Sequence, residues 1–184
     1  MVQFGTLLGH IICKDGVCVD PTKVAEIFHM EPSRKVKQQR ETLGHTGYYR
    51  RFVRNYASIT TPMEMLLKRK EEFTWTSDCQ TTLNKLKERL VSAHILVYPD
   101  WNKMFHVHIN YSRIVLGVVL EQPREKNMDH PVCYASRKLS TEKRKYITTK
   151  REALTMVTLY ISLGTIYWAH HSNSLQTIPR LNTW

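Results

Sequence analysis

Two histidines and an asparagine alternate with apolar residues over residues 105–110, so they share one face of a predicted strand. Imidazole nitrogens and carboxylate oxygens are common ligands of zinc. The candidate ligand set for such a metal is His106, His108, Asn110 and Glu152. The simpler interpretation is that the two histidines are ordinary half-exposed strand residues, because histidine pairs are common and ligand spacing alone is a weak signal. The sequence therefore assigns no metal site.

Positive charge is concentrated in one part of the chain. The sequence has 27 lysines and arginines against 16 aspartates and glutamates, which gives a formal net charge of +11. Between residues 34 and 70 the basic residues are opposed only by Glu41 and Glu64, so most of the excess charge lies in this segment. A chain this basic is usually matched to a polyanion, either a nucleic acid or an anionic membrane surface, although a solvated lysine-rich face is the simpler alternative.

The first predicted element is a β-hairpin. β-branched and aliphatic residues over 6–13 and 17–19 flank the pair Asp15-Gly16, which favours a tight turn between two strands. Asp20 is then a good N-cap for a helix that has an apolar stripe. The residues of that stripe are Val24, Ile27 and Phe28.

Further helices are predicted over residues 34–90. In the first, apolar positions recur at helical spacing, but Gly44 and Gly47 interrupt them, which predicts two short helices joined by a glycine elbow. Thr61 begins the next helix, with proline in its first turn, and Thr76 caps the one after it. The apolar positions of this last helix are Cys79, Leu83, Leu86 and Leu90.

The apolar period changes to two after the last of these helices, which predicts β-strands. Strands are expected over 105–110, 114–120 and 132–135. A polar loop that holds Pro123 and Pro131 is expected to separate the last two. A helix should then begin at Thr149 and continue to Tyr160.

Neither a membrane span nor secretion is expected. The uncharged stretch 153–169 approaches the length of a span, but it contains several hydroxyl side chains and follows a charged helix start, which favours a buried helix and a buried strand. The four cysteines show no CxxC spacing, and no signal-like segment precedes them. We therefore expect reduced thiols in an intracellular protein of the cytoplasm or nucleus.

Short strings of aromatic, glycine and basic residues recur along the chain. In the first part they are Leu8-Gly9-His10-Ile11, Lys14-Asp15-Gly16, Arg40-Glu41-Thr42-Leu43-Gly44 and Gly47-Tyr48-Tyr49-Arg50-Arg51-Phe52. Further on they are Phe73-Thr74-Trp75-Thr76, Phe105–Ile109, Gly117–Leu120, Tyr134–Leu139 and Tyr146–Ala153. In this order they resemble the Pol polyprotein of gypsy-type long-terminal-repeat retrotransposons, and the collinearity makes the resemblance specific where a single motif would be weak.

The resemblance implies an α+β fold in three parts. Residues 1–19 correspond to the end of the reverse transcriptase palm, where a hairpin grips the primer. Residues 20–71 correspond to the small helical thumb, and residues 72–184 to an incomplete RNase H-like mixed β-sheet with helices, truncated at the C-terminus. Because the paired aspartates of a polymerase site would precede the hairpin, we expect this chain to lack that site.

The resemblance also implies a cluster of carboxylates that holds two Mg²⁺ ions for RNase H chemistry. Glu152 stands at one of the family's carboxylate positions. Asn110 and His170 stand at two others, where neither side chain supplies a negative charge. An amide or an imidazole cannot neutralise a hard cation as a carboxylate does, so we expect a degraded nuclease site without a confident bound metal.

What remains, by this resemblance, is binding of nucleic acid such as an RNA/DNA hybrid or a primer-template. The expected contact residues are Gly9, His10, Lys35, Lys37, Arg40, Tyr48, Tyr49, Arg50, Arg51 and Arg54. The basic residues would contact phosphates, whereas Tyr48 or Tyr49 would stack or would instead belong to the thumb core. Two alternatives stay open, an active RNase H and a marginally folded remnant, and the chain could be one piece of a longer Pol polyprotein.

Polar residues depart from the family pattern on the thumb helix. Gln39 stands where the family usually has an apolar residue, and Thr42 replaces a bulky aromatic one. Burial of Gln39 without partners would cost roughly 1–3 kcal/mol. Such changes are typical of a sequence that is no longer held to its original task.

Overall fold

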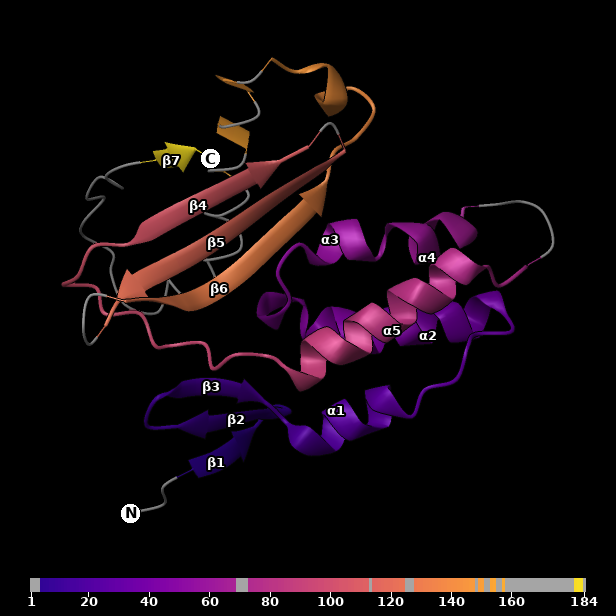
Figure 1. Ribbon diagram of the computed structural model, residues 1–184, viewed down its shortest axis with the longest axis horizontal. Coiled ribbons are helices and arrows are strands. Elements are labelled where there is room, and N and C mark those ends of the chain that lie inside the picture. The colour runs from indigo at the N-terminus through magenta and orange to yellow at the C-terminus, as the bar shows by residue number, and fades with distance from the viewer. Residues whose placement is uncertain are drawn as a thin grey trace.

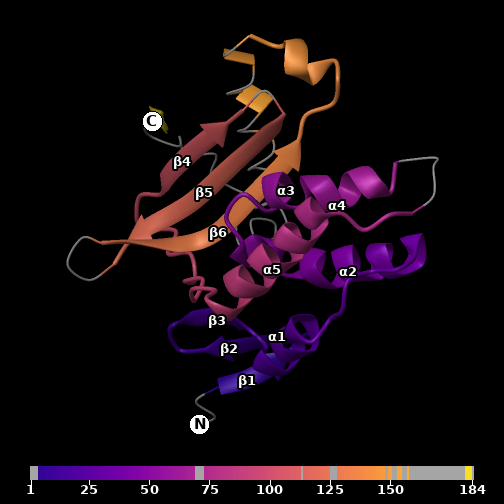
Figure 2. The same ribbon diagram turned by 45° about the vertical axis from the view of Figure 1, so that its right-hand side comes forward.

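The fold is described from a computed structural model that covers residues 4–68, 73–112, 114–124, 128–147, 149–150, 153–154, 157 and 181–183. Two β-sheets and several helices make a mixed α+β architecture, as expected. The smaller, N-terminal sheet lies on one side of the molecule and the larger sheet on the other, with helices packed beside both (Figure 1, Figure 2). Within the described ranges, no helix combines the length and the apolar character that crossing a bilayer requires.

The smaller sheet consists of the antiparallel strands β1 (Phe4–Leu7), β2 (His10–Cys13) and β3 (Gly16–Val19). β2 and β3 form the predicted hairpin, but its two-residue turn is Lys14-Asp15, and Gly16 is the first residue of β3 and the partner of Cys13. The prediction of one strand over residues 6–13 was wrong, because the chain reverses at Leu8-Gly9 and β1 pairs with β2. Both turn residues have positive φ, 48° and 68°, the combination that two-residue turns between antiparallel strands favour.

Gly16 allows a close approach between the hairpin and the segment that precedes the larger sheet. Its φ is +152°, and a Cβ at this position would meet the Leu96 carbonyl oxygen at 2.1 Å. Val17 and Leu96 exchange two backbone hydrogen bonds, of 2.8 and 2.9 Å. Any side chain at position 16 would therefore separate these two segments.

Helix α1 (Pro21–Phe28) begins where the sequence predicted. The Asp20 side chain accepts a hydrogen bond of 2.9 Å from a backbone N–H of the first turn, which satisfies a donor that has no partner within the helix. Two of the three predicted stripe residues are buried, but Phe28 is 52% exposed. The prediction was wrong at Phe28, whose ring stays at the surface with the Lys87 ammonium over it, 5.8 Å from the ring centroid.

Helix α2 (Val36–Tyr48) is continuous, so the predicted elbow at Gly44 and Gly47 was wrong. A glycine inside a helix costs roughly 1 kcal/mol relative to alanine, and the packing of one face of α2 against its neighbours outweighs this cost. The fully packed positions on that face are Gln39, Thr42 and Thr46. The chain leaves the helix only at Tyr49.

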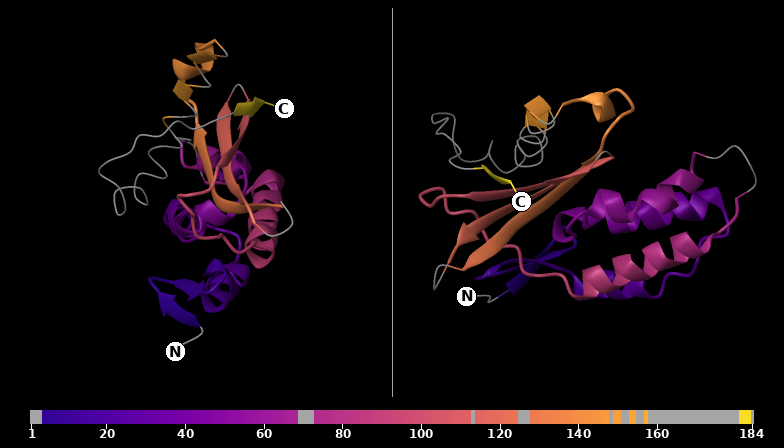
Figure 3. Two further views of the ribbon diagram at one scale, coloured as in Figure 1. Left: turned by 90° about the vertical axis from the view of Figure 1, so that its left-hand side faces the viewer. Right: turned by 45° about the horizontal axis from the view of Figure 1, so that its top comes forward.

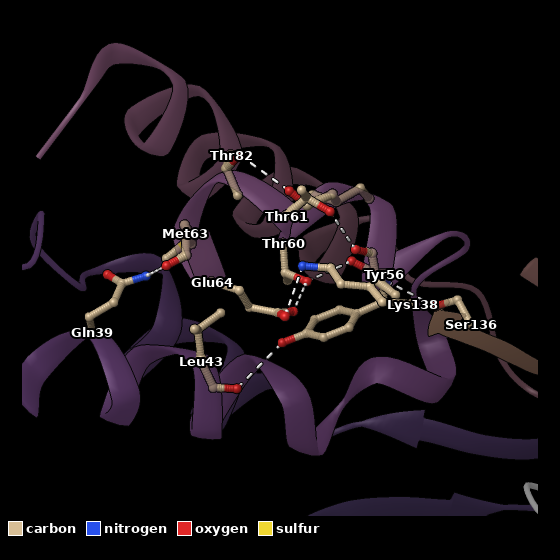
Figure 4. A network of polar contacts seen from close by, with 12 residues as sticks. Gln39, Leu43, Tyr56, Thr60, Thr61, Met63, Glu64, Thr82, Ser136 and Lys138 are labelled. Atoms are coloured by element: carbon tan, nitrogen blue, oxygen red, sulfur yellow. Dashed lines mark hydrogen bonds and ion pairs between the residues drawn. The ribbon is translucent and has the colours of Figure 1, made fainter. Parts of the chain in front are cut away.

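Gln39 is the one large polar side chain buried on α2, with 0% exposure. Its Nε2 donates to the Met63 carbonyl oxygen at 3.2 Å, whereas its Oε1 has no partner among the described residues. Figure 4 shows this contact at one end of a wider polar network. Only one of the two polar atoms of the Gln39 amide therefore has a hydrogen-bond partner among the described residues. The unpaired oxygen costs about 1–3 kcal/mol of folding free energy.

The helical segment continues through η1 (Arg50–Phe52), α3 (Tyr56–Ile59), α4 (Thr61–Leu66) and α5 (Ser77–Val91). The predicted starts of α4 and α5 are confirmed, and Thr76 Oγ1 caps α5 by accepting a hydrogen bond from the Cys79 N–H at 3.4 Å. The predicted apolar face of α5 is buried. Cys79, Leu83 and Leu86 of this face pack on Met63 and Leu66 of α4 to form one core of the molecule. Leu90 belongs to a second core, with Tyr49 and Phe52.

The larger sheet has the order β6-β5-β4-β7 and is mixed, because only the β4–β7 pair is parallel. Its strands are β4 (His106–Tyr111), β5 (Val115–Pro123), β6 (Asp129–Lys138) and β7 (Leu181–Thr183). The predicted alternation on β4 is confirmed, since Val107 and Ile109 are buried in the sheet core. Pro123 and Pro131 lie within strands and not in a loop, which corrects the prediction. Pro123 ends β5 and Pro131 lies at a register shift beside Glu121, where a missing N–H is tolerated.

Helical residues follow β6 in the described part of 143–157. A short 3₁₀ helix, η3 (Lys143–Lys145), is followed by helical residues at 149–150, 153–154 and 157. These positions agree with the predicted helix from Thr149. They lie on the far side of the larger sheet from α4 and α5 (Figure 1, Figure 3).

Polar contacts join α3 and α4 to β6. The Ala57 N–H donates to Ser136 Oγ at 2.9 Å, and Lys138 Nζ lies 2.8 Å from Glu64 Oε2. Glu64 also accepts a hydrogen bond of 2.8 Å from Thr60 Oγ1. Figure 4 shows Ser136 and Lys138 reaching from the strand to the helices. These contacts set the position of the helical segment on the larger sheet.

Candidate nucleic-acid interface and metal-ligating residues

The Leu8-Gly9 turn is held by two tyrosines that end α2. The Tyr48 hydroxyl donates to the Leu8 carbonyl oxygen, and the Tyr49 hydroxyl donates to the Gly9 carbonyl oxygen at 2.8 Å. Gly9 suits this site because its φ is +68° and a Cβ would meet the Tyr49 hydroxyl at 3.3 Å. The structure therefore brings together four of the predicted contact residues, namely Gly9, His10, Tyr48 and Tyr49.

His10 lies at the centre of an aromatic cluster beside this turn. Its ring centroid lies 5.1, 5.5 and 5.6 Å from those of Tyr48, Tyr49 and Phe52. Its Nδ1 is 3.0 Å from the Leu8 carbonyl oxygen, which can only accept, so Nδ1 carries the proton. Burial lowers the pKa of His10 and the charge of Arg51 acts in the same direction, while the hydrogen bond to Leu8 opposes them. The ring is neutral at pH 7, and its buried Nε2 has no partner in the described part of the chain.

Exposure separates the two predicted roles of the tyrosines. Tyr49 is 3% exposed and packs in the core with Phe52 and Val53. Tyr48 is 51% exposed. The core interpretation therefore applies to Tyr49, and only Tyr48 has ring surface on which a base could stack.

The basic residues of α2 follow its exposed side. Steps of three and four residues place one set of positions on a single helix face. We name this set the α2 stripe, and its members are Lys37, Arg40, Gly44 and Tyr48, all exposed. Lys35 precedes the helix and is exposed as well. At 1.5 Å per residue the surface from Lys35 to Tyr48 is about 20 Å long, enough to follow several phosphates of one strand.

The middle of the α2 stripe has no side chain. A Cβ built on Gly44 would meet nothing within 4 Å, so the glycine is not required by packing inside the protein. Glycine in a helix weakens it, and an exposed glycine of this kind is suited to a close approach by another molecule. Sequence reasoning treated Gly44 as a helix breaker and missed this position.

The three arginines that follow α2 form a second basic group. Arg50 and Arg54 are exposed and Arg51 is half-buried. Arg51 lies close enough to His10 to lower its pKa. It also acts on Cys133 of β6, where burial raises the pKa of the thiol to about 11 and the Arg51 charge opposes this only in part. Arg51 therefore lies where the smaller sheet, the helices and the larger sheet meet.

A pocket of about 350 Å³ lies between the Arg54-Asn55 segment and strands β4 and β5. Asn110, the predicted position of a family carboxylate, is exposed and borders this pocket. Gly117 is the register partner of Asn110, and a Cβ there would meet Asn55 Oδ1 at 2.4 Å. Among the described residues that border the pocket, Glu121 is the only carboxylate and Arg54 brings a guanidinium. The described residues around Asn110 therefore do not make a strongly negative site.

The other two residues at expected carboxylate positions, Glu152 and His170, lie outside the described residues. The zinc set that included Glu152 is therefore described only in part. His106 and His108 do project to one face of β4, because Val107 between them is buried in the sheet core. Asn110 belongs to the same face, and both Asn110 and His108 border the pocket beside Arg54.

Each histidine of β4 contacts a carboxylate from another strand of the larger sheet. His106 Nδ1 lies 2.9 and 2.8 Å from the two carboxylate oxygens of Asp129 on β6. His108 Nε2 lies 3.0 Å from Glu121 Oε2 on β5. Sequence reasoning missed Glu121 and Asp129, because the strand register that aligns them with the histidines is not encoded in residue spacing. The local signal for Glu121 was a single acid after the apolar run that begins β5.

Known proteins share both the sequence and the fold. Residues 75–172 match the RNase H-like domain found in reverse transcriptase. The chain is 33% identical over 161 residues to the retrovirus-related Pol polyprotein from transposon opus of Drosophila melanogaster, covering 82% of this chain and 16% of that protein. It is 36% identical over 151 residues to the polyprotein from transposon 297 of the same organism, covering 82% and 14%. The chain therefore spans 14–16% of the length of these relatives.

The fold is similar to that of a foamy viral protease-reverse transcriptase whose structure was solved in complex with an RNA/DNA hybrid. The TM-score is 0.74 at 23% sequence identity, and the match covers 88% of this chain and 22% of that one. At this identity the likeness concerns the fold. It includes the helices and the larger sheet together, since most of the chain is superposed.

Proposed function

We propose that the helical part of this chain binds nucleic acid, because the chain belongs to the retrovirus-related Pol polyproteins and carries the RNase H-like domain found in reverse transcriptase. Residues 1–19 would be the end of a palm, 20–71 a thumb, and 72–184 the RNase H-like domain. The parent element is of the gypsy type. The protein acts inside the cell, where its four cysteines, all free in this structure, stay reduced.

The observation that carries this proposal is the packing of the Leu8-Gly9 turn against the end of the α2 stripe. Tyr48 belongs to both, since its hydroxyl bonds the turn and its ring is half exposed. One strand of a bound nucleic acid that follows Lys37 and Arg40 along α2 would therefore reach the Leu8-Gly9 turn without a break. Phosphate contacts supply the affinity, and stacking on Tyr48 supplies a sequence-tolerant addition.

An RNA/DNA hybrid is the preferred ligand in this proposal. The similar foamy viral protein was solved with such a hybrid. Exposed lysines and arginines recognise a duplex by its phosphates and shape without reading base sequence. We therefore expect affinity for hybrids of any sequence, with a steep dependence on salt.

Arginine removal on the α2 stripe tests the interface. Arg40→Ala should weaken binding of a fluorescent RNA/DNA hybrid and reduce the slope of log affinity against log salt by about 1, because one phosphate contact is lost. Fluorescence anisotropy at several salt concentrations measures both quantities. Lys85→Ala is the matched control, since it removes one exposed charge from α5. Equal effects of the two substitutions would show that only net charge matters.

The Mg²⁺ ions of the parent family do not fit the described residues around Asn110. Two hard cations need several carboxylate oxygens close together. Asn110 offers a neutral amide, Arg54 adds a positive charge, and Glu121 lies 3.0 Å from His108. In this proposal the nuclease site is degenerate and the protein binds hybrids without cutting them.

A cleavage assay tests the loss of nuclease activity. Purified protein with magnesium should leave the RNA strand of a labelled hybrid intact under conditions in which anisotropy shows the hybrid bound. Cleavage that disappears on Glu152→Gln would contradict the degenerate site and would support an active RNase H. A thermal melt followed by circular dichroism accompanies the assay, because a chain without a cooperative transition would be the marginally folded remnant.

A further inference from the structure

We propose that His108, Glu121 and Asp129 form a binding site for a divalent ion of the zinc type, with His106 as a positioning residue. The site differs from the carboxylate cluster implied by the family, since it uses neither Asn110 nor Glu152. It also does not depend on nucleic-acid binding by the helical part.

Three adjacent strands bring the ligands together. β5 lies between β4 and β6, and Glu121 on β5 is the register partner of His106 on β4. Ligand atoms of His108, Glu121 and Asp129 all lie within 4.8 Å of one another. Ligand atoms of a tetrahedral zinc ion, bound at about 2.0–2.2 Å, lie roughly 3.3–3.6 Å apart. Side-chain rotation without movement of the strands would therefore complete the site.

His108 has a nitrogen that the protein leaves unpaired. Its Nε2 is buried and makes no hydrogen bond within the described residues, although Glu121 Oε2 is only 3.0 Å away. At 3.0 Å the two groups are close enough for an ion pair, but they are not aligned for a hydrogen bond. Direction is the stricter physical test of such a bond. A metal ion between the two groups would use the nitrogen lone pair and the carboxylate together.

His106 orients the carboxylate of Asp129. Its Nδ1 lies 2.9 and 2.8 Å from the two Asp129 oxygens, which restrains the rotation of an otherwise exposed side chain. Outer hydrogen bonds of this kind orient metal ligands and contribute strongly to affinity. Without His106 we expect Asp129 to be a mobile and weaker ligand.

The donor set selects the class of ion. One imidazole nitrogen with two carboxylates suits Zn²⁺, Co²⁺ and similar ions, whereas Mg²⁺ prefers oxygen ligands in octahedral geometry. The Asp129 side of the site is exposed, so a water molecule can take the fourth position. The site should therefore bind zinc in preference to magnesium.

Calorimetric titration of the full chain with zinc chloride tests the proposal. We expect one saturable site in the unmodified protein and at least a tenfold loss of affinity in each of His108→Asn, Glu121→Gln and Asp129→Asn. His106→Asn should weaken binding by roughly 10- to 100-fold, as loss of an outer-shell partner does. His94→Asn and Glu88→Gln are matched controls that remove an exposed histidine and an exposed carboxylate elsewhere, and they should leave affinity unchanged.

Two further measurements keep the outcome clear. Circular dichroism without metal identifies any variant that fails to fold, and the visible absorption of bound Co²⁺ reports tetrahedral coordination in the unmodified chain. Absence of saturable zinc binding would overturn the proposal. Equal binding by the ligand variants and the controls would overturn it too, as would magnesium that competes on equal terms with zinc.

Discussion

His10 shows how residues from distant parts of the chain determine the properties of one side chain. Leu8 fixes its tautomer by accepting from Nδ1, and three aromatic rings from the end of α2 and η1 surround it. Burial then lowers the pKa of His10, with Arg51 acting in the same direction. A predicted contact residue of the hairpin is therefore also a neutral part of the junction with the helices.

The lowered pKa of His10 has a consequence for stability against pH. The unfolded chain takes up the proton at the ordinary value, near 6.5, before the folded chain does, so the contribution of His10 is complete above that pH and is lost as the pH falls below it. His10→Gln should therefore lose less unfolding free energy between pH 7.5 and pH 5.5 than the unmodified protein. Urea denaturation at both pH values measures the difference.

The control for this prediction is His94→Gln, because His94 is exposed. We expect its acid-induced loss of stability to equal that of the unmodified chain. If His10→Gln lost as much stability on acidification as the unmodified protein, burial of a neutral His10 ring would not contribute to the acid-induced loss of stability.

At the scale of elements, α2 combines a packed face with an open one. Gln39, Thr42 and Thr46 are buried on one side, while the α2 stripe is exposed on the other. The two glycines of the helix differ accordingly. A Cβ on Gly44 would meet nothing within 4 Å, whereas one on Gly47 would meet the Tyr56 hydroxyl at 3.4 Å.

Gly44→Ala should separate stability from binding. Alanine favours the helix, so we expect the free energy of unfolding to rise by about 0.5–1 kcal/mol. The added methyl group stands between Arg40 and Tyr48 on the α2 stripe, so affinity for the RNA/DNA hybrid should fall several-fold. Gly47→Ala, on the packed side, should leave affinity unchanged. A Gly44→Ala protein that is more stable and binds equally well would place the interface elsewhere.

At the scale of the whole molecule, the helical part and the larger sheet are coupled by a small number of polar contacts. Lys138 of β6 pairs with Glu64 of α4 at 2.8 Å, and both side chains are mostly buried, with 22% and 35% exposure. Thr60 adds a charge-assisted hydrogen bond to Glu64. The pair therefore loses less to solvent screening than a surface ion pair does.

A double-mutant cycle on this pair measures the coupling. Glu64→Gln and Lys138→Met, separately and together, should give an interaction energy of about 1 kcal/mol in urea unfolding. The same cycle on Lys23 and Glu26, an exposed pair at 2.8 Å on α1, should give a smaller interaction energy, because solvent screens the two charges. Equal values in the two cycles would mean that burial between α4 and β6 adds nothing to the pair.

Local signals in the sequence determined most of the elements and their ends. Asp20 and Thr76 cap helices where predicted, and the alternation on β4 is confirmed, because caps and periodicity depend only on near neighbours. The continuity of α2 and the turn at Leu8-Gly9 were not predicted, because packing and tyrosines from the far end of α2 decide them. Likewise, the motif predicted that Asn110 lies on a strand, but it did not predict that Arg54 borders the same pocket.

Which side chains meet depends on the tertiary fold. The grouping of His106, His108, Glu121 and Asp129 depends on the register of three strands, including a shift beside Glu121. Tyr48 is exposed and Tyr49 is buried because only one side of this segment packs on the core. The family, the charge and the order of helices and strands follow from the sequence alone, since these are properties of segments. Contacts between segments have no local signature, because the free energy that selects them comes from burial and is shared across the whole chain.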